Sequence, residues 1–542
     1  MKTALTTVKM AFVAILLPCI FITQSFGQKP QQHSDWATYN GNYAGDRFSS
    51  LKQITSTNVK KLRLLHSFNL GTDVSSMQTG PVVINGVMYF STDTITYAID
   101  AVTGTLKWKK IRSVEKPVGY GANRGLAYLN GKLFRGASDA HVFALNAADG
   151  KILWDVPLDI AGPGVSIPMA PIAFQDMLFI GNAGGDNANI TGNVYALDVN
   201  DGHVIWKFKV VPDSGDVRKT WPAAEHGHPV SGGAFWTTFT LDTLKGVLYV
   251  PAGNPAPDFD TEVRENGQEL YTNSVIALAI KTGKMLGYIQ LVKKDNHDWD
   301  VDSGPTLITT KDGKEIIASA NKSGLLSVID RTAINTQTEA TMSSPVLSLL
   351  YEVPTTVREN ELAPLSRTAF THFKPGTLGG SEWNGAAYNP DLDLIYTGAV
   401  DWGVSVKLFP LDSAKMKYPD GANMFGGNMK FDPPATARGW VTAFDTKDGT
   451  VKWKFKAPAP ILAGVTPTAG GLVFTAAQNG DVYAFDAQTG KVLWKTTTNL
   501  PNGGGVITYA VKGKQYLAVA AGMKSQLWPK PSNASKILIY GL

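Results

Sequence analysis

Four aspartates crowd into one short segment, DNHDWDVDSG (295–304), where they occupy positions Asp295, Asp298, Asp300 and Asp302. Aspartate and glycine are common in turns, so one interpretation is a solvated surface loop. Carboxylate oxygens are also the ligands that hard cations prefer, so the other interpretation is a cation site beside a reacting group. The segment alone does not separate these interpretations, and the elements that position it must be considered.

The composition is that of a globular protein. The chain has 542 residues, of which 44% are hydrophobic and 18% charged, and its formal net charge is +5. This length suits several small domains or one large domain built from repeats. The charge is small, and no lysine- or arginine-rich cluster with interleaved aromatic residues is present, so no nucleic-acid partner is predicted.

The first 27 residues have the pattern of a secretory signal peptide. A positively charged start precedes the apolar run AFVAILLPCIFI, and small residues precede an expected cleavage point near Gly27. This run is too short for a membrane span, and no other segment is long and apolar enough to be one. The single cysteine, Cys19, lies inside the signal, so the mature chain 28–542 has neither disulfides nor a Cys-x-x-Cys-His haem attachment site. We therefore expect a soluble periplasmic protein.

A repeat runs along the mature chain. Each copy has an alternating apolar strand followed by Asp/Asn-x-x-x-Gly-x-x-x-Trp. The copies end at Trp108, Trp154, Trp206, Trp453 and Trp494, and degenerate copies lie at 276–287 and 326–335.

Each part of the repeat has a physical role. Alternating apolar and polar residues form a half-buried strand, the Asp-x-x-x-Gly segment makes the turn, and the tryptophan packs against a neighbouring unit. The full copies recur at intervals of roughly 40 to 50 residues, which is typical of one four-stranded propeller blade. The sequence therefore predicts an all-β, eight-bladed β-propeller over 28–542 with structural tryptophans. Any chemistry is expected where loops converge on the central channel.

The tryptophan-ended repeat resembles the tryptophan-docking motif of dehydrogenases that use pyrroloquinoline quinone (PQQ). The resemblance covers almost the whole mature chain, including an opening segment at 35–71 and a closing segment at 502–522. Non-catalytic propellers of outer-membrane assembly share the repeat, so the site motifs discriminate better than the repeat does.

The resemblance implies a PQQ site in the central channel. In SGGAFWTTF, Trp236 matches the flat tryptophan on which PQQ stacks, and an indole offers a large rigid face for a fused-ring quinone. Arg124, in NRGLAY, matches an arginine that binds a PQQ carboxylate through parallel hydrogen bonds. Gln78 falls near the same cofactor edge, and Lys322 matches a cation that contacts the quinone oxygens. Such a cation would stabilise negative charge on the reduced cofactor.

The same resemblance resolves the acidic segment. DWDVDSGPTL resembles the segment that carries the family's catalytic base and metal ligand, here Asp300. Asp302 resembles an additional aspartate of lanthanide-dependent alcohol dehydrogenases, although calcium- or magnesium-using glucose dehydrogenases also carry Asp-x-Asp. Asn254 and Asp186 match the other metal ligands, so the expected cation is Ca²⁺, with a lanthanide as the alternative. Asp295 and Asp298 are interpreted as loop residues.

Several positions depart from the family pattern. Asp186, in GNAGGD, stands where the family has glutamate and is one methylene shorter. Val118 and Gly119 occupy the positions of two adjacent cysteines found in many alcohol dehydrogenases of the family, and Pro168 occupies that of a threonine. The segment SEWNGAAY resembles a related branch. It places Glu382, Trp383 and Asn384 near the channel, and we assign Trp383 and Asn384 to the cofactor site.

The expected function is oxidation of an alcohol, polyol or sugar hydroxyl by metal-assisted hydride transfer to PQQ. Asp300 would take the hydroxyl proton, and the electrons would pass to an external periplasmic acceptor such as a cytochrome c. Two alternatives stay open. One is a non-catalytic propeller that binds protein partners and keeps a vestigial PQQ site. The other is a sensor that binds PQQ without turning over a substrate.

Overall fold

The computed structural model describes residues 35–542, apart from 74, 115–120, 161, 339, 343–345, 415–417, 526 and 530. All described residues belong to one compact unit, His33–Leu542. The expected signal peptide, 1–27, and the positions Val118 and Gly119 lie outside the described residues. Within the described part of the chain, no helix has the length and apolar character needed to cross a membrane.

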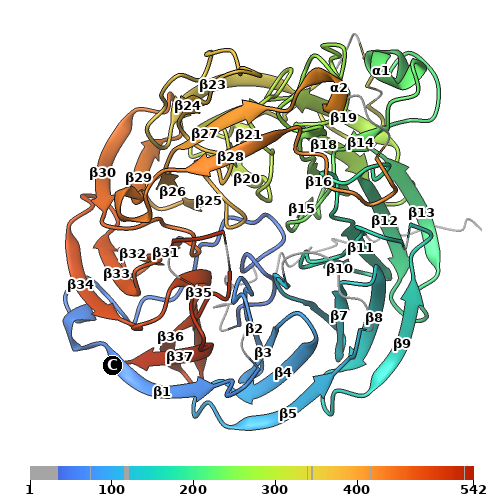
Figure 1. The fold of residues 1–542 in the computed structure, drawn as a ribbon. Helices are drawn as coiled ribbons and strands as arrows, with labels where there is room; N and C mark the ends of the chain where they lie inside the picture. Colours follow the sequence, from blue (N-terminus) through green and yellow to red (C-terminus); the bar gives the residue numbers. More distant parts are fainter. Residues whose placement is uncertain are drawn as a thin grey trace, which may run out of the picture. The chain divides into compact units, whose positions relative to one another are not determined.

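Four-stranded antiparallel sheets follow one another around a ring (Figure 1). The described residues form eight of them, which agrees with the number of predicted blades, and the predicted all-β propeller is confirmed. The four strands of each sheet, in order of pairing, are β2 (Val82–Ile84), β3 (Val87–Ser91), β4 (Ile95–Asp100) and β5 (Leu106–Ile111); β6 (Ala127–Leu129), β7 (Lys132–Gly136), β8 (His141–Asn146) and β9 (Ile152–Pro157); β10 (Ile172–Phe174), β11 (Met177–Gly181), β12 (Asn193–Asp198) and β13 (Val204–Lys209); β15 (Thr240–Asp242), β16 (Val247–Pro251), β18 (Ser274–Ala279) and β19 (Met285–Gln290); β20 (Thr306–Thr309), β21 (Glu315–Ala320), β22 (Leu325–Asp330) and β23 (Ser348–Pro354); β25 (Ala386–Asn389), β26 (Leu394–Asp401), β29 (Arg438–Asp445) and β30 (Val451–Ala457); β31 (Thr466–Thr468), β32 (Leu472–Ala476), β33 (Asp481–Asp486) and β34 (Val492–Thr497); and β1 (Arg63–Asn69), β37 (Lys536–Gly541), β36 (Lys514–Ala521) and β35 (Asn502–Val511).

The sequence pattern of each strand follows its place in the sheet. Middle strands such as β4 are buried along almost their whole length, because neighbouring sheets cover both of their faces. Strands at the outer edge, such as β5, are largely exposed and carry lysines, which discourage edge-to-edge pairing. The hydrophobic core therefore lies between sheets. One cluster, for example, joins Val82 and Tyr89 of one sheet to Leu133 and Phe143 of the next.

The repeat tryptophans join each sheet to the following one, which confirms their structural role. The indole N–H of Trp154 donates to the Val199 carbonyl at 3.2 Å, and that of Trp453 donates to the Ala487 carbonyl at 3.0 Å. The corresponding bonds of the other repeats join Trp108 to Ala147, Trp206 to Ile280 and Trp494 to Leu62. For four of these five tryptophans, the indole also lies against the turn glycine of the next repeat, at Gly150, Gly202, Gly283 and Gly490.

Replacing Gly490 with alanine is expected to destabilise the protein more than the same change at Gly513. Both glycines have positive φ, near +71° and +74°, so each alanine pays a backbone cost of about 1–2 kcal/mol. At Gly490 the added Cβ would also lie 2.5 Å from the Trp453 ring, whereas at Gly513 it meets nothing within 4 Å. The packing clash adds about 1–3 kcal/mol. Urea midpoints of the two variants measure the difference, and equal midpoints would contradict the docking role.

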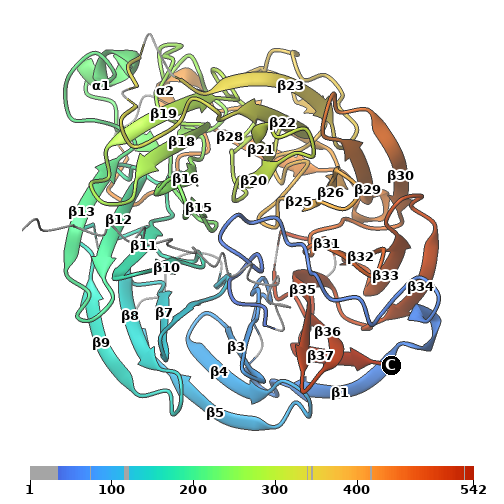
Figure 2. The same ribbon diagram turned by 180° about the vertical axis from the view of Figure 1, so that it is seen from behind.

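The ring is closed by strands from distant parts of the sequence. Strand β1 pairs antiparallel with β37, so an early segment forms the outer strand of the sheet whose other strands come from residues 502–541 (Figure 2). Hydrogen bonds between Ser75 and Ser535, which are 460 positions apart, fasten the same junction. This closure covers the edge of β37, which pairs with β1 on one side and β36 on the other.

Two smaller sheets and a few short helices interrupt the ring pattern. The smaller sheets are formed by β14 (Ser231–Gly232) with β17 (Pro255–Ala256), and by β24 (Thr371–Phe373) with β27 (Val404–Leu408) and β28 (Gly427–Phe431). Strands β27 and β28, with helix α2 (Leu411–Ala414) between them, form an insertion that separates β26 from its partner β29. The other helices are α1 (Pro222–Glu225) and the 3₁₀ turns η1 (Val59–Lys61), η2 (Arg218–Thr220) and η3 (Pro434–Thr436).

Candidate active site

A cavity of about 600 Å³ lies where loops from several sheets meet, and its size is in the range of about 300–1,000 Å³ usual for small-molecule sites. Most of the predicted site residues line it: Gln78, Arg124, Asp186, Trp236, Asn254, Asp300, Lys322 and Trp383. Two predicted residues, Asp302 and Asn384, are buried but do not line it. The sequence prediction that chemistry concentrates where blade loops converge therefore agrees with the position of the cavity.

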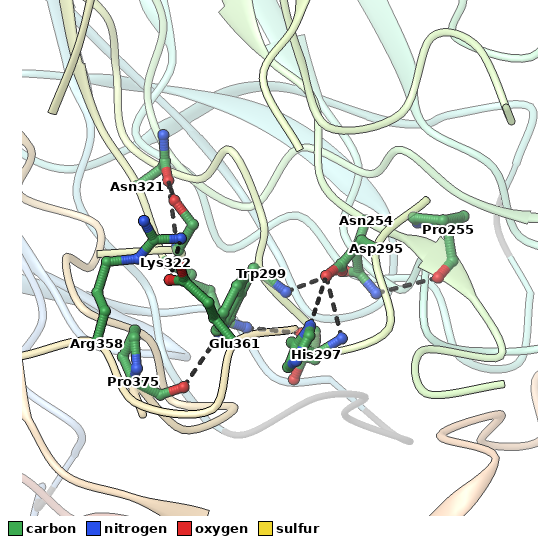
Figure 3. Close-up of polar contacts among 12 residues, drawn as sticks. Asn254, Pro255, Asp295, His297, Trp299, Asn321, Lys322, Arg358, Glu361 and Pro375 are labelled. Atoms are coloured by element: carbon green, nitrogen blue, oxygen red, sulfur yellow. Dashed lines mark hydrogen bonds and ion pairs between the residues drawn. The ribbon is translucent and has the colours of Figure 1, made fainter. Parts of the chain in front are cut away.

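The acidic segment is not a solvated loop, because Asp295, His297 and Trp299 are buried in the core. The Asp295 carboxylate accepts the backbone N–H groups of His297 and Trp299 at 3.0 and 2.9 Å (Figure 3). The Trp299 indole donates to the Pro375 carbonyl at 3.2 Å and stacks on the His297 ring at 4.1 Å. Burial, followed by the charge of Arg358, lowers the pKa of His297 to about 3, so this imidazole is neutral and acts as a packing group. Asp295 is a loop-building residue, as predicted.

The other aspartates alternate with buried apolar residues. Trp299 and Val301 pack into the core, and in an extended chain the residues between them point the other way. Asp300 is held from two sides: its Oδ1 accepts the backbone N–H of Asn254 at 2.8 Å, and its Oδ2 accepts the Lys322 ammonium at 3.1 Å. A Cβ at Gly253 would lie 2.5 Å from Asp300 Oδ1, so this close approach requires glycine.

Asp298 was interpreted from sequence as a loop residue, and here the structure differs. Its carboxylate lines the cavity and accepts the Lys322 ammonium at 2.6 Å, a shorter contact than the one to Asp300. Asp298 has a φ of 62°, so it is not part of an extended strand, and no alternation along the sequence predicted that it lines the cavity.

Buried carboxylates outnumber cations around the cavity. Burial acts to lower the pKa of Lys322, but the charges of Asp298, Asp300 and Glu382 outweigh it and raise that pKa well above its ordinary value. Burial, with Asp300 nearby, raises the pKa of Asp186 to about 6. Burial also raises the pKa of Glu382 to about 8, although Lys322 and Arg124 oppose it. Such shifts arise where negative charges share a dry site without enough positive charge.

Two of these carboxylates have no hydrogen-bond partner among the described residues. Both oxygens of Asp302 are buried and unpartnered, and burial, Glu382 and Asp300 raise its pKa well above the ordinary value. The same holds for Asp258, which is fully buried, with its pKa raised by burial and by Asp186 and Asp298. Sequence analysis missed Asp258, since an aspartate in NPAPDFD reads as a turn residue. Unpartnered buried carboxylates of this kind are expected where a cation binds.

Arg124 lies between two tryptophans at the cavity wall. Its Cζ lies 4.5 Å from the centroid of the Trp236 ring and 5.1 Å from that of Trp383, and one terminal nitrogen donates to the Trp236 carbonyl at 2.9 Å. Its Nε is buried without a partner among the described residues. Burial lowers the pKa of Arg124 to about 10, which leaves it charged at neutral pH. Pro168, where a threonine was expected, supplies its backbone carbonyl to the Arg124 N–H at 2.7 Å.

The remaining predicted residues differ in how free their polar atoms are. The Gln78 side-chain oxygen is buried and unpartnered among the described residues, so it can accept a bond from a ligand in the cavity. The Trp383 indole N–H donates to the Gly503 carbonyl at 2.7 Å, which fixes the ring. Asn384 donates to the Leu462 and Gly503 carbonyls and accepts the Tyr39 hydroxyl. Asn384 therefore braces the wall and has no polar atom left for the cavity.

Apolar side chains also line the cavity. The β27–β28 insertion contributes Phe425, Met429 and Phe431, and other loops add Leu378 and Trp528. The carboxylates and Lys322 line the same cavity. The lining can therefore hold a ligand that has both a charged group and an apolar group.

Comparison with known proteins agrees with this architecture. The family model described as glucose/ethanol/alcohol dehydrogenase, beta-propeller domain, matches residues 36–333, and that of outer membrane protein assembly factor BamB matches residues 437–534. The chain is 29% identical to a quinohemoprotein alcohol dehydrogenase of Comamonas testosteroni, over 90% of this chain and 72% of the relative. It is 28% identical to a quinoprotein alcohol dehydrogenase of Pseudomonas putida, over 91% of this chain and 87% of the relative. The crystal structure of a quinohemoprotein alcohol dehydrogenase from Comamonas testosteroni superimposes with a TM-score of 0.79 and 26% identity, over 94% of this chain and 81% of that one.

Proposed function

This chain belongs to the glucose/ethanol/alcohol dehydrogenase β-propeller family, and on that premise we propose that it is a PQQ-dependent dehydrogenase that oxidises an alcohol. The observation that carries the proposal is the convergence of Arg124, Trp236, Asn254, Asp300 and Lys322 on one cavity. These residues come from distant parts of the sequence, and no single structural requirement of a propeller brings all five together.

The residues present suit both PQQ and a cation. Among the described residues, the Arg124 Nε–H has no hydrogen-bond partner, so it can donate to a carboxylate of PQQ, and the unpartnered Gln78 side-chain oxygen can accept from an N–H or O–H group of a ligand. For the cation, the side-chain oxygen of Asn254 accepts no hydrogen bond from the described residues, and neither carboxylate oxygen of Asp302 does. Asp186 and Asp300 complete the oxygen donor set lining or adjoining the cavity.

When bound, PQQ accepts the hydride and the cation polarises a quinone carbonyl. The protein's own part is to place a base and a charge. Asp300 takes the hydroxyl proton of the substrate, and its orientation is fixed by the Asn254 N–H and by Lys322. Lys322 forms an ion pair with Asp300 and supplies positive charge where negative charge grows during reduction. Gly253 gives Asp300 the room that this geometry needs.

The cation is Ca²⁺ or a lanthanide, and the excess of carboxylates favours the trivalent ion by Coulomb attraction. Asp302 is the residue that carries this preference, because neither of its oxygens has a hydrogen-bond partner in the described part of the chain. Replacing Asp302 with asparagine is expected to shift the preference from La³⁺ towards Ca²⁺. Competition between the two ions, measured as the La³⁺ concentration that displaces bound Ca²⁺, tests this; an unchanged ratio would contradict it.

The apolar lining formed by Leu378, Phe425, Phe431 and Trp528 supports an alcohol with an apolar substituent as substrate. A sugar or polyol would need hydroxyl partners throughout the cavity, and an apolar lining leaves those hydroxyls unpaired. Substrate oxidation therefore improves with apolar size rather than with hydroxyl number.

The protein acts in the periplasm, where the predicted signal peptide 1–27 would direct it. The mature chain carries no cysteine and so no covalent haem of the Cys-x-x-Cys-His type. Electrons therefore leave to a separate acceptor, for which a periplasmic cytochrome c is suited.

Reconstitution tests this function. Metal-free protein without PQQ is given PQQ together with Ca²⁺ or La³⁺, and reduction of an artificial dye is followed with alcohols of increasing chain length, polyols and aldoses. Turnover is expected only with both PQQ and a cation, and kcat/KM is expected to rise along the alcohol series. If PQQ binds with neither cation, the chain shares only the fold of the family, and the scaffold interpretation is favoured. Tight PQQ binding with no turnover of any substrate would favour the sensor.

A further inference from the structure

Asp258 stands apart from the other buried acids of its own segment. It is fully buried, and neither carboxylate oxygen has a hydrogen-bond partner among the described residues. Asp260, two residues later, is equally buried, but Arg367 holds both of its oxygens, at 2.9 and 3.0 Å. The segment therefore satisfies one carboxylate completely and leaves the other without a partner.

Backbone contacts bring Asp258 close to the proposed cation ligands from two directions. Along the chain, it follows Asn254 by four residues, and Asn254 lines the cavity. Across the chain, Met424 joins it to Asp186: the Met424 N–H donates to the Asp186 carbonyl at 2.8 Å, and the Met424 carbonyl accepts the Asp258 N–H at 3.2 Å. Asp186 and Asp258 thus flank the same residue of the β27–β28 insertion.

An isolated buried carboxylate is costly, so such a group keeps its proton unless it is paired or binds a cation. The Lys322 ammonium, whose charge acts on Asp258, is already shared by Asp298 and Asp300. Asp186 carries a side chain one methylene shorter than a glutamate, so its oxygens would reach less far towards a cation held by Asn254 and Asp300. A second carboxylate on the Asp186 side would compensate for the shorter Asp186 side chain.

We propose that Asp258 supplies an additional carboxylate oxygen to the cation site, on the side of Asp186. The inference rests on the proposed function in so far as that function requires a cation. It adds a ligand from a different position, and it explains why an aspartate suffices at position 186. The occupant is a hard cation, because the groups that would hold it, those of Asp186, Asn254, Asp258 and Asp300, are anionic or neutral oxygen donors.

The test compares Asp258→Asn with Asp260→Asn in the full-length protein without PQQ. Binding of Tb³⁺ is measured by tryptophan-sensitised luminescence, and bound water is counted from Eu³⁺ luminescence lifetimes in H₂O and D₂O. Asp258→Asn is expected to weaken Tb³⁺ binding by about tenfold or more. Asp258→Ala is expected to admit an additional water to Eu³⁺. Asp260→Asn removes an acid that Arg367 already neutralises, so its Tb³⁺ affinity is expected to stay at the wild-type value.

A second readout separates a ligand from a merely structural acid. If Asp258 binds the cation, its replacement by asparagine removes no side-chain hydrogen bond that the described residues make in the metal-free protein, so the melting temperature of metal-free Asp258→Asn equals or exceeds that of wild type. Its rise on adding Tb³⁺ is then smaller than in wild type. Unchanged Tb³⁺ affinity, or a lowered metal-free melting temperature with the Tb³⁺ response intact, would overturn the proposal alone. Failure of the wild-type protein to bind Tb³⁺ or Ca²⁺ would overturn it together with the cation requirement of the proposed function.

Discussion

Replacing Asp300 with asparagine is expected to lower kcat by about 10²–10⁴-fold in protein saturated with PQQ and cation, the usual contribution of a positioned general base. Asparagine preserves the size of the side chain and can still accept the Asn254 N–H, but it cannot take a proton from the substrate. Stopped-flow reduction of bound PQQ by substrate measures the chemical step directly. Melting temperature and PQQ affinity are measured on the same samples.

The matched variant is Asp302→Asn, which removes a carboxylate two residues away. Its effect is expected to depend on which cation is supplied, whereas Asp300→Asn is expected to be slow with every cation. Retained turnover in Asp300→Asn would assign the base elsewhere, with Glu382 the next group to examine because it also lines the cavity. A wild-type protein with no turnover to lose would instead support the scaffold interpretation.

The metal-free protein is expected to lose stability as the pH rises from about 4 to 8. Asp186 has its pKa raised from 3.8 to about 6, and Glu382 has its pKa raised from 4.5 to about 8. Between these values the folded state keeps protons that the unfolded state has released, so the free energy of unfolding falls with rising pH. The stabilising contribution is complete below about pH 4 and is lost as the pH passes through the raised values.

A bound cation is expected to remove this pH dependence, since it stabilises the ionised carboxylates and binds the folded state alone. Melting temperatures at pH 5 and pH 8, with and without Ca²⁺ or La³⁺, measure the effect: the fall of several degrees in metal-free protein should disappear with saturating cation. Glu382→Gln provides the control. In this variant the melting temperature of the metal-free protein should no longer show the part of the fall above about pH 6 that Glu382 causes. A metal-free protein that gains stability over this interval would show that the carboxylates are compensated in another way.

The fold could be predicted from the sequence because each repeat contains the local patterns that determine its strands and turn. Strand alternation, the turn glycine and the docking tryptophan all lie within about a dozen residues, so local patterns suffice. The cavity residues needed more. Arg124 and Trp236 are unremarkable one at a time, and only the family resemblance predicted their meeting, which the cavity lining agrees with.

What the sequence could not supply depends on contacts between distant segments. In the sequence, Asp258 looks like an ordinary turn aspartate. The structure distinguishes it, because its carboxylate has no hydrogen-bond partner among the described residues whereas that of Asp260 is bound by Arg367. Asp298 was interpreted as a loop residue because sequence alone does not show where the Lys322 ammonium lies. Part of the apolar lining comes from the β27–β28 insertion. This insertion lacks the repeat pattern, so the sequence periodicity did not predict it. The roles of the individual cofactor and metal residues stay predictions until the variants are measured.

The closing sheet also fixes the order in which the protein can be made and loaded. Ser76 and Gln78 line the cavity from one side of the junction and Trp528 from the other, and Ser76 is bridged to Met523. During synthesis, the amino-terminal strand β1 must wait for β37, and until they pair the cavity has no complete wall. Capture of a cofactor is therefore a late event that follows the last strand pairing. A cell could then store finished but inactive protein and switch it on through the supply of cofactor and metal alone.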